Sequence, residues 1–327
     1  ITIFDMKLLC FVGLFAAAVA QAQTSPADTL PHYDFVVAAD GSGDFRTVQE
    51  AIDAVPALRY KRTHIFIKNG IYKEKLVLPP TPGNVTFGGE NVDSPIPSSD
   101  DYASRKNRFG EEIGTSGSAS FFIFGDGFEA RNITFENSAG PVGQAVAVRV
   151  GGDKGKFENC RFLGHQDTLY PHGKKSRQYY KNCYIEGTVD FIFGWSAAVF
   201  DSCRIFCISP GYVTAASTEE QSKTGFVFRR CRIYGSAAEH SVYLGRPWRP
   251  HAKVVFLECE LSNIIRPAGW HNWGKASNEA TAFFAEYENT GPGASTAERV
   301  TWSHILTKEA AQAYTLPNLL DGWDPDQ

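Results

Sequence analysis

A phrase in which apolar and polar residues alternate recurs six times along the chain. Its copies read ARNITF ending at Phe135, FENCRF at Phe162, YKNCYI at Ile185, FDSCRI at Ile205, FRRCRI at Ile233 and FLECEL at Leu261. Alternation with a period of two predicts β-strands. The shared apolar position falls at residues 133, 160, 183, 203, 231 and 259, so successive copies are 27, 23, 20, 28 and 28 residues apart. Strands that recur at such intervals predict a solenoid.

The repeats are too short to hold a helix as well as a strand, and the text between them is rich in glycine with further strand patterns at 146–150 and 188–193. We therefore predict an all-β fold, a single-stranded parallel β-helix in which each coil adds one strand to each of several stacked sheets. In five copies the shared position is a cysteine, namely Cys160, Cys183, Cys203, Cys231 and Cys259. These side chains should form one inward stack of small, unpaired thiols, because free cysteine packs as a small hydrophobe.

Helices are expected only at the ends of this solenoid. Residues 44–55 read DFRTVQEAIDAV, in which Thr47 and Glu50 form a capping box ahead of apolar residues on one face. This N-terminal helix should cover the open end of the sheets. Residues 307–314 predict a short helical C-terminal tail, and the Gly-, Ser- and Asp-rich stretch 90–120 predicts a long excursion between coils.

The first residues predict an export signal. Residues 6–23 read MKLLCFVGLFAAAVAQAQ, a lysine followed by a short apolar run and small residues, which is typical of a secretory signal peptide. The predicted organisation is 1–5 as non-native upstream residues, 6–23 as the signal peptide and 33–327 as the β-helix domain with its tail. We expect a secreted protein, extracellular or periplasmic, without membrane insertion, because no other apolar stretch approaches the ~20 residues of a spanning helix.

Charge and motif content exclude several classes of function. The net charge is −4, so no overall positive field exists to attract nucleic acid. The eight histidines are scattered, and neither an HExxH nor a CxxC pair occurs. We therefore expect no metal, no cofactor and no nucleic-acid partner, and we expect a monomer. The absence of a GxSxG pattern argues against an ordinary serine esterase.

Two aspartates interrupt apolar text at equivalent places in the repeat. Asp167 lies seven residues after Cys160, and Asp190 lies seven residues after Cys183. In a solenoid this puts them on one face of adjacent coils, about 4.8 Å apart along the sheet. Two carboxylates at that distance do not both ionise freely, so their pKa values are driven apart.

Two further polar residues fall on the same line by similar counts. Gln144 precedes Cys160 by the 16 residues that separate Asp167 from Cys183, which places Gln144 one rung before Asp167, with Gln166 beside the line. Arg246 precedes Cys259 by 13 residues, as Asp190 precedes Cys203, so Arg246 is expected about two rungs (~10 Å) from Asp190. For each residue taken alone, a structural role remains the alternative to a functional one. The aspartates could cap turns, and the arginine could pair with an aspartate only to stabilise the fold.

At these residues the sequence resembles the pectinesterases (pectin methylesterases), and more closely their bacterial members. The resemblance runs from about Tyr33 to the early 300s. Its motifs are GIYKE at 70–74, QAVAVR at 144–149, GHQDTLY at 164–170, GTVDFIFG at 187–194 and LGRPW at 244–248. The resemblance implies a right-handed parallel β-helix, in agreement with the repeated phrase.

The resemblance also implies roles for the aligned residues. Asp190 would be the nucleophile, and Asp167 the general acid and then base. Gln144 and Gln166 would stabilise the oxyanion, while Arg246 would orient Asp190 and keep it ionised. The implied reaction is hydrolysis of the C6 methyl esters of pectin homogalacturonan to methanol and pectate. No cofactor is implied.

The same resemblance implies an aromatic groove for the pectin chain. Trp248 and Trp270 would line it, together with Phe193, His165 and Tyr170. Two other classes remain open at this point: a glycoside hydrolase acting on pectic polysaccharide, whose carboxylates can be ~5 to 5.5 Å apart, and a non-catalytic polysaccharide-binding solenoid. The two glutamine amides favour acyl chemistry, and the aligned acid pair favours an enzyme.

Overall fold

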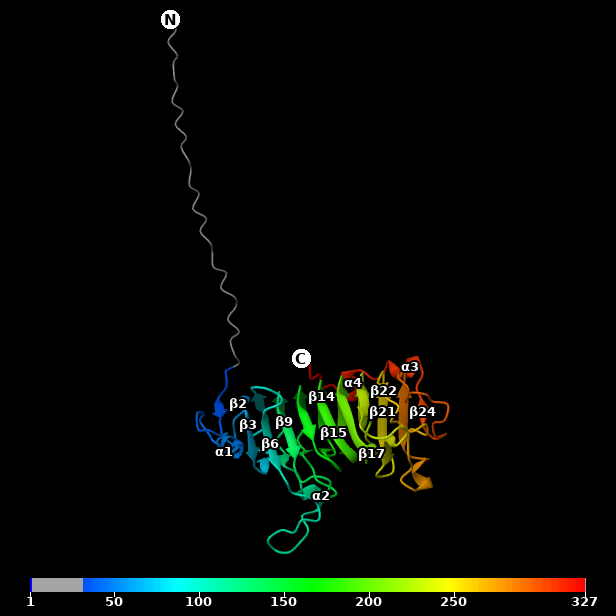
Figure 1. Cartoon of the computed structure of the whole chain (residues 1–327), viewed down its shortest axis with the longest axis horizontal. Coiled ribbons are helices and arrows are strands. Elements are labelled where there is room, and N and C mark those ends of the chain that lie inside the picture. The colour runs from blue at the N-terminus through cyan, green and yellow to red at the C-terminus, as the bar shows by residue number, and fades with distance from the viewer. Residues whose placement is uncertain (2–31, 327) are drawn as a thin grey trace. The chain divides into compact units, whose positions relative to one another are not determined.

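The computed structural model describes residues 1 and 32–326. The chain divides into two units, Ile1–His32 and Tyr33–Gln327. The predicted signal peptide at 6–23, and all but the first of the predicted upstream residues 1–5, lie outside the described residues. The second unit is a parallel β-helix whose coils follow one another along its length (Figure 1).

One sheet runs along one side of this unit and contains 11 strands, in the order β1-β2-β5-β8-β11-β14-β16-β18-β21-β23-β24. Its strands are β1 Phe35–Val37, β2 Thr63–Ile67, β5 Val85–Gly89, β8 Glu129–Arg131, β11 Gly155–Glu158, β14 Arg177–Lys181, β16 Ala197–Asp201, β18 Phe226–Arg229, β21 Lys253–Leu257, β23 Phe283–Tyr287 and β24 His304–Ile305. Every neighbouring pair is parallel. We call it the long sheet.

The second sheet contains 13 strands. Its strands are β3 Gly70–Lys73, β4 Leu76–Leu78, β6 Pro95–Ser99, β7 Phe121–Ile123, β9 Thr134–Asn137, β10 Val148–Val150, β12 Arg161–Leu163, β13 Leu169–Pro171, β15 Tyr184–Gly194, β17 Arg204–Ala216, β19 Arg232–Gly235, β20 Val242–Pro247 and β22 Glu260–Leu261. Strands β3, β6, β9, β12, β19 and β22 form one half of this sheet, and β4, β7, β10, β13 and β20 form the other. The long strands β15 and β17 each pair with strands of both halves and so join them into one sheet. The parallel β-helix predicted from the repeated phrase is confirmed.

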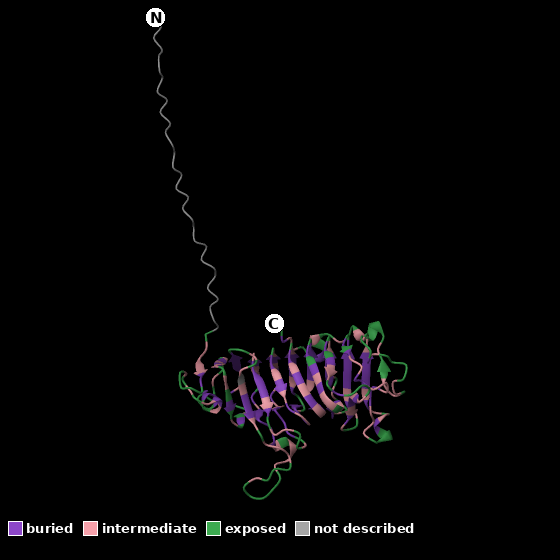
Figure 2. Cartoon of the chain, viewed as in Figure 1, coloured by how far each residue is buried: buried purple, intermediate pink, exposed green. Residues whose placement is uncertain are grey.

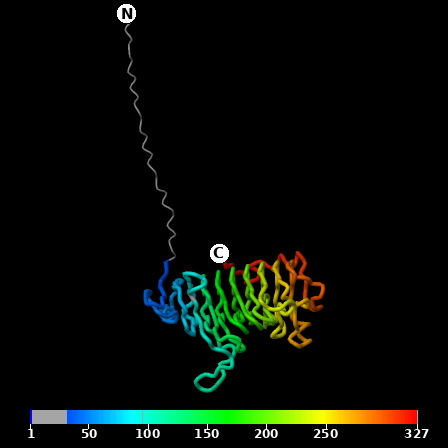
Figure 3. Tube along the Cα trace, in the orientation of Figure 1, coloured from blue at the N-terminus to red at the C-terminus, as the bar shows by residue number. Residues whose placement is uncertain are grey.

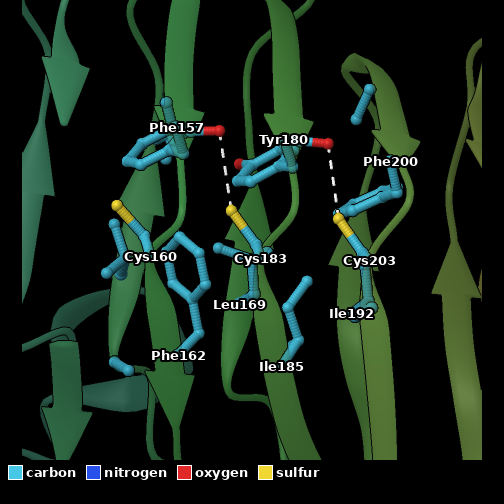
Figure 4. Packing of buried hydrophobic residues seen from close by; sticks show 14 of the residues in the cluster. Phe157, Cys160, Phe162, Leu169, Tyr180, Cys183, Ile185, Ile192, Phe200 and Cys203 are labelled. Carbon is cyan, nitrogen blue, oxygen red and sulfur yellow. Dashed lines mark hydrogen bonds between the residues drawn. The ribbon is translucent and has the colours of Figure 1, made fainter. Parts of the chain in front are cut away.

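Aromatic side chains stack from coil to coil inside the long sheet. Tyr180, Phe200, Phe228 and Phe256 are register partners on successive strands. Their ring centroids are 4.7, 4.5 and 4.4 Å apart, and all four rings are buried. Such offset-stacked pairs add to the burial energy of each rung. Figure 2 shows the buried residues running along the strands, and Figure 4 shows part of the stack.

The cysteine stack is also confirmed. All five cysteines of the repeated phrase are buried and unpaired, and Cys207 is a further buried free thiol. Each of the five thiols donates a weak hydrogen bond to a long-sheet carbonyl one coil back, at 3.3 to 3.6 Å. Figure 4 shows two of these bonds, from Cys183 to Phe157 and from Cys203 to Tyr180.

A left-handed residue makes the turn between the two sheets in each of these coils. The residue before every shared position has a positive φ between 50° and 57°, at Asn132, Asn159, Asn182, Ser202, Arg230 and Glu258. Asparagine adopts this conformation more readily than most residues, which explains its recurrence in the phrase. The phrase therefore encodes a strand, a sharp turn and an inward thiol in succession.

The ends of the fold agree with the sequence only in part. Helix α1, Val48–Asp53, has the predicted capping box between Thr47 and Glu50. The predicted helix 307–314 is a single turn, α3 Lys308–Ala311, and a second turn, α4 Leu316–Leu319, follows. Leu319 and Leu320 pack with Tyr179 and Val199 of the long sheet. Among the described residues, no helix combines the length and apolar character needed to cross a bilayer.

The predicted excursion 90–120 is wrong for its first part. Residues 95–99 form strand β6 within the second sheet. Only residues 100–120, between β6 and β7, leave the coils; we call this segment the projecting loop, and it contains the short helix α2, Gly114–Gly117 (Figure 1 and Figure 3). A short 3-10 helix, η1 Ala276–Asn278, lies in the loop before β23.

Candidate active site

The two aspartates lie on adjacent rungs, as the counts predict. Leu169 in β13 pairs with Ile192 in β15, and the backbone N–H of Asp167 donates to the carbonyl of Val189 at 3.2 Å. Asp167 and Asp190 therefore occupy equivalent places, and each is only 6% exposed. Both have positive φ values, 66° and 54°. Such backbone conformations are uncommon outside glycine and cluster at functional sites.

Arg246 in β20 reaches Asp190 from two coils away. Its Nε donates to Oδ1 of Asp190 at 2.9 Å, and its Nη2 donates to Oδ2 at 2.7 Å. The expected register is wrong by three residues, because Arg246 pairs with Ala215, which in turn pairs with Phe193 rather than Asp190. The length of the arginine side chain makes up the difference.

Gln144 and Gln166 pair with each other in an isolated parallel bridge. The prediction that Gln144 stands one rung before Asp167 is therefore wrong by one residue. The N–H of Ala145 donates to the carbonyl of Gln166 at 3.1 Å, which holds the two backbones together. Both glutamine side chains border the same cleft as the aspartates.

Burial and charge raise the pKa of both aspartates. The pKa of Asp167 lies well above its ordinary value, mainly because of burial and also because of the negative charge of Asp190, while Arg246 acts in the opposite direction. Burial also raises the pKa of Asp190, against the two hydrogen bonds and the charge of Arg246. No donor among the described residues hydrogen-bonds to the Asp167 carboxyl group. The environment thus favours the proton on Asp167 and the negative charge on Asp190.

These residues share an open cleft of about 450 Å³. The cleft is lined by Ile113, Gly114, Thr115, Ser116, Gln144, Gln166, Asp167, Tyr170, Asp190, Phe193, Ala215, Arg246, Trp248 and Trp273. The projecting loop supplies the first four, and it is tied to the coils because Ala103 N–H donates to the carbonyl of Gln144 at 2.8 Å. The polar composition of this loop gave no sign that it forms a wall of the cleft.

Several aromatic rings border the cleft. Tyr170 stacks on Phe193 with centroids 4.0 Å apart, and Phe193 lies 6.0 Å from Trp248. Beyond Trp248 a second hollow of about 570 Å³ continues the surface, with Trp195 and Arg249 among its lining residues. Aromatic rings in an open, partly polar groove suit the faces of sugar rings.

Two of the predicted groove residues lie elsewhere. Trp270 is 1% exposed in the core, where it packs against Phe284 and donates from Nε1 to Glu286 at 3.2 Å. Trp273, three residues later, lines the cleft instead and was missed by the sequence analysis. His165 is partly exposed but is not among the residues that line the cleft.

Within residues 32–326, no three His, Cys, Asp or Glu side chains are arranged to hold a metal ion.

Fold and cleft together define a β-helical hydrolase with a paired-carboxylate site. A model of the pectinesterase family matches residues 34–323. The chain belongs to the pectinesterase family.

Individual relatives agree with this assignment. The chain is 45% identical over 291 residues to Pectinesterase 31 of Arabidopsis thaliana, covering 87% of this chain and 91% of the relative. It spans 52% and 48% of the length of two further Arabidopsis relatives, whose names join pectinesterase with pectinesterase inhibitor.

Solved structures show the same fold. Pectin methylesterase from carrot superimposes with a TM-score of 0.82 at 38% identity, covering 90% of this chain and 95% of that one. Pectin methylesterase from Erwinia chrysanthemi gives a TM-score of 0.80 at 28% identity, covering 90% and 99%. The expected closer likeness to bacterial members is not supported, because the plant proteins have the higher identity.

Proposed function

We propose that this chain hydrolyses the C6 methyl esters of pectin homogalacturonan, releasing methanol and pectate. The observation that carries the proposal is the unequal treatment of two adjacent acids. Asp190 receives two charged hydrogen bonds from Arg246, whereas Asp167 is buried beside it and receives none from any residue that the structure describes. A fixed carboxylate nucleophile next to a carboxyl group that retains its proton is what ester hydrolysis by paired acids needs.

In the first step, a carboxylate oxygen of Asp190 adds to the C6 carbonyl carbon of the ester. The negative charge moves to the carbonyl oxygen, where the side-chain amides of Gln144 and Gln166 can donate hydrogen bonds. Such donors are worth roughly 3 to 4 kcal/mol each in esterases. The bond from C6 to the methoxy oxygen then breaks as Asp167 gives its proton to that oxygen, and methanol leaves.

In the second step, the resulting anhydride between Asp190 and C6 is hydrolysed. Asp167, now ionised, takes a proton from water while the water oxygen adds to C6. Cleavage of the bond between C6 and Asp190 releases the galacturonate carboxyl group. Asp190 is again a carboxylate and Asp167 again carries its proton, so the site is ready for another ester.

The aromatic surface supports a polymeric substrate. Trp248 is partly exposed and offers an apolar face to galacturonate rings, while Tyr170 and Phe193, only 2% and 3% exposed, border the cleft from the core. The hollow around Trp195 extends this surface beyond the reacting ester. His165 and Trp270 are not part of this surface. Trp273 takes the place that was expected for Trp270.

The setting of the reaction is part of the proposal. The pattern of residues 6–23 supports secretion, and we propose a monomeric enzyme whose β-helix domain spans residues 33–327 and which works without a cofactor. N-terminal sequencing of the exported protein tests the cleavage, and light scattering tests the molar mass. Cleavage elsewhere than near residue 23, or a stable dimer, would overturn the corresponding part.

One assay tests the chemistry. Wild type and Asp190→Ala are incubated with highly methylated pectin, and both methanol and new reducing ends are measured. Wild type should release methanol without reducing ends, and Asp190→Ala should release neither. Reducing ends without methanol would indicate a glycoside hydrolase, and binding without either product would indicate a non-catalytic solenoid.

A further inference from the structure

Two aromatic rings enclose the guanidinium group of Arg246. Its central carbon lies 3.9 Å from the centroid of the Tyr212 ring and 3.8 Å from the centroid of the Trp273 ring. A planar guanidinium has two faces, and two rings this close to its centre fit only on opposite faces. Its edge remains free for the two N–H donors that bind Asp190. Both faces of the Arg246 guanidinium are therefore covered by rings, and one of its edges is bound to Asp190.

The stack continues away from the cleft. Tyr212 in β17 pairs with Tyr243 in β20, and their rings lie 5.3 Å apart at an angle of 9°. The guanidinium of Arg266 lies 4.9 Å from the centroid of Tyr243. We call this series the cation–ring column; in order, it contains Trp273, Arg246, Tyr212, Tyr243 and Arg266.

Backbone contacts fix the outer ring of the column. The N–H of Trp273 donates to Nδ1 of His271 at 3.1 Å, and the N–H of His271 donates to the carbonyl of Gly245 at 3.1 Å. Nδ1 can accept only in the neutral imidazole. Burial, together with the charges of Arg246 and Arg266, lowers the pKa of His271 and so favours that form. Trp273 is therefore tied to the residue next to Arg246.

We propose that Tyr212 and Trp273 are positioning residues that hold Arg246 in the orientation from which it donates twice to Asp190. Arg246 stands three residues out of register with Asp190, so its side chain must lean along the sheet to reach the carboxylate. A flexible arginine loses rotamer freedom in doing so, and the two rings restrict it beforehand. Tyr212 does not line the cleft, so it can act on the reaction only through the side chains it contacts, which include Arg246 and His271. The inference rests on the proposed function, which gives the Arg246–Asp190 pair its role.

Two substitutions at Tyr212 separate the ring from the rest of the side chain. Tyr212→Phe keeps the ring and should keep kcat within about twofold. Tyr212→Leu removes the π face and should lower kcat about 3- to 30-fold, the range that one cation–π contact supports, with little change in KM. The acid limb of the kcat/KM profile should move to higher pH, because a loosened Arg246 opposes the raised pKa of Asp190 less. Arg246 also lowers the pKa of Asp167 and of His271, so the same loosening should move those two pKa values upward as well.

Tyr234→Leu is the matched control, since it removes a ring that lies 4.9 Å from Arg232 in β19, outside the cleft. It should leave kcat and the pH profile unchanged. In an Arg246→Lys background, Tyr212→Leu should cost little further activity, because its partner is already altered. Wild-type kcat and pH profile in Tyr212→Leu, or an undiminished further loss in the double variant, would overturn the proposal.

Stability measurements keep the test independent of the reaction. If wild type releases no methanol, the proposed function fails. The free energies of unfolding of wild type, Tyr212→Leu, Arg246→Lys and the double variant still form a double-mutant cycle that tests the contact. Coupling between Tyr212 and Arg246 supports the contact, and additive losses overturn it. Should Tyr212→Leu fail to fold, Tyr212→Met, which also lacks a π face, carries the same expectations.

Discussion

Arg246 and Asp190 are joined by two hydrogen bonds, of 2.9 and 2.7 Å, although they belong to strands two coils apart. Both side chains are largely buried, with 19% and 8% of their surface exposed. Removing one partner of a buried ion pair leaves an unpaired charge, so the remaining group changes its pKa or the fold loses stability. The pair therefore links the stability of the second sheet to the ionisation of the proposed nucleophile.

Arg246→Lys should lower kcat/KM by roughly 10- to 100-fold, because an ammonium group cannot donate in the same planar, two-pronged geometry. Weaker pairing lets burial raise the pKa of Asp190 further, so the acid limb of the rate profile should move to higher pH. Arg230→Lys is the control, since Arg230 also contacts both oxygens of a buried aspartate, Asp201, at 2.6 and 2.7 Å. Equal kinetic losses in both variants would show that the effect of Arg246 is only structural.

Asp167→Asn should lower kcat by about 10² to 10⁴, the range typical of a general acid–base group, while binding of pectin oligomers changes little. Asparagine keeps the shape of the side chain but can neither give a proton to methanol nor take one from water. Steady-state kinetics and equilibrium binding on the same variant measure the two quantities. A large loss of binding with unchanged kcat would assign Asp167 to the substrate subsite instead of to proton transfer.

The sequence predicted the acid pair because the coil between Asp167 and Asp190 has the same length as the coil between Cys160 and Cys183. That equality fails further along the chain. Phe193 and Arg246 are in register through Ala215, and Ala198 and Val254 are in register through Phe226. Five residues separate Phe193 from Ala198 but eight separate Arg246 from Val254, so the connection from β20 to β21 is three residues longer than the one from β15 to β16. Loops tolerate such insertions without leaving any period in the sequence. A count from the cysteines therefore finds the right coil for Arg246 but not its partner.

Trp270 and Trp273 show a second limit. The two indoles are three residues apart outside the regular strands, where no alternation tells inward from outward positions. The bridge between Gly245 and Trp270 draws Trp270 into the coil, and Trp273 turns to the cleft with a φ of 66°. The bridge to Gly245 and the contact of Trp273 with Arg246 both join residues that are far apart in the sequence, so the local pattern around the two indoles does not reveal them.

All six cysteines among the described residues should be reactive only after unfolding. They are buried and unpaired, and five of them donate to backbone carbonyls in the stack. A thiol reagent should therefore react slowly with the native protein and find six thiols per chain from residue 24 onward in denaturant without reductant. Finding two or four instead would mean that disulfides join neighbouring rungs.

Asp167→Asn should also stabilise the fold at neutral pH, by roughly 1 to 3 kcal/mol, because it removes a buried acid that must either keep its proton or carry a charge to which no described residue donates a hydrogen bond. Since the folded-state pKa of Asp167 is raised, its protonated form contributes stability that is fully present below the unfolded pKa of about 3.9 and is lost as pH rises through the folded pKa. The advantage of asparagine should thus be absent near pH 3.5, grow with pH and then level off. Denaturant unfolding of both proteins across this range measures it. Glu298→Gln, at an exposed acid, is the control for exchanging an acid for an amide; a gain for Asp167→Asn that is equally large at every pH would contradict the raised pKa.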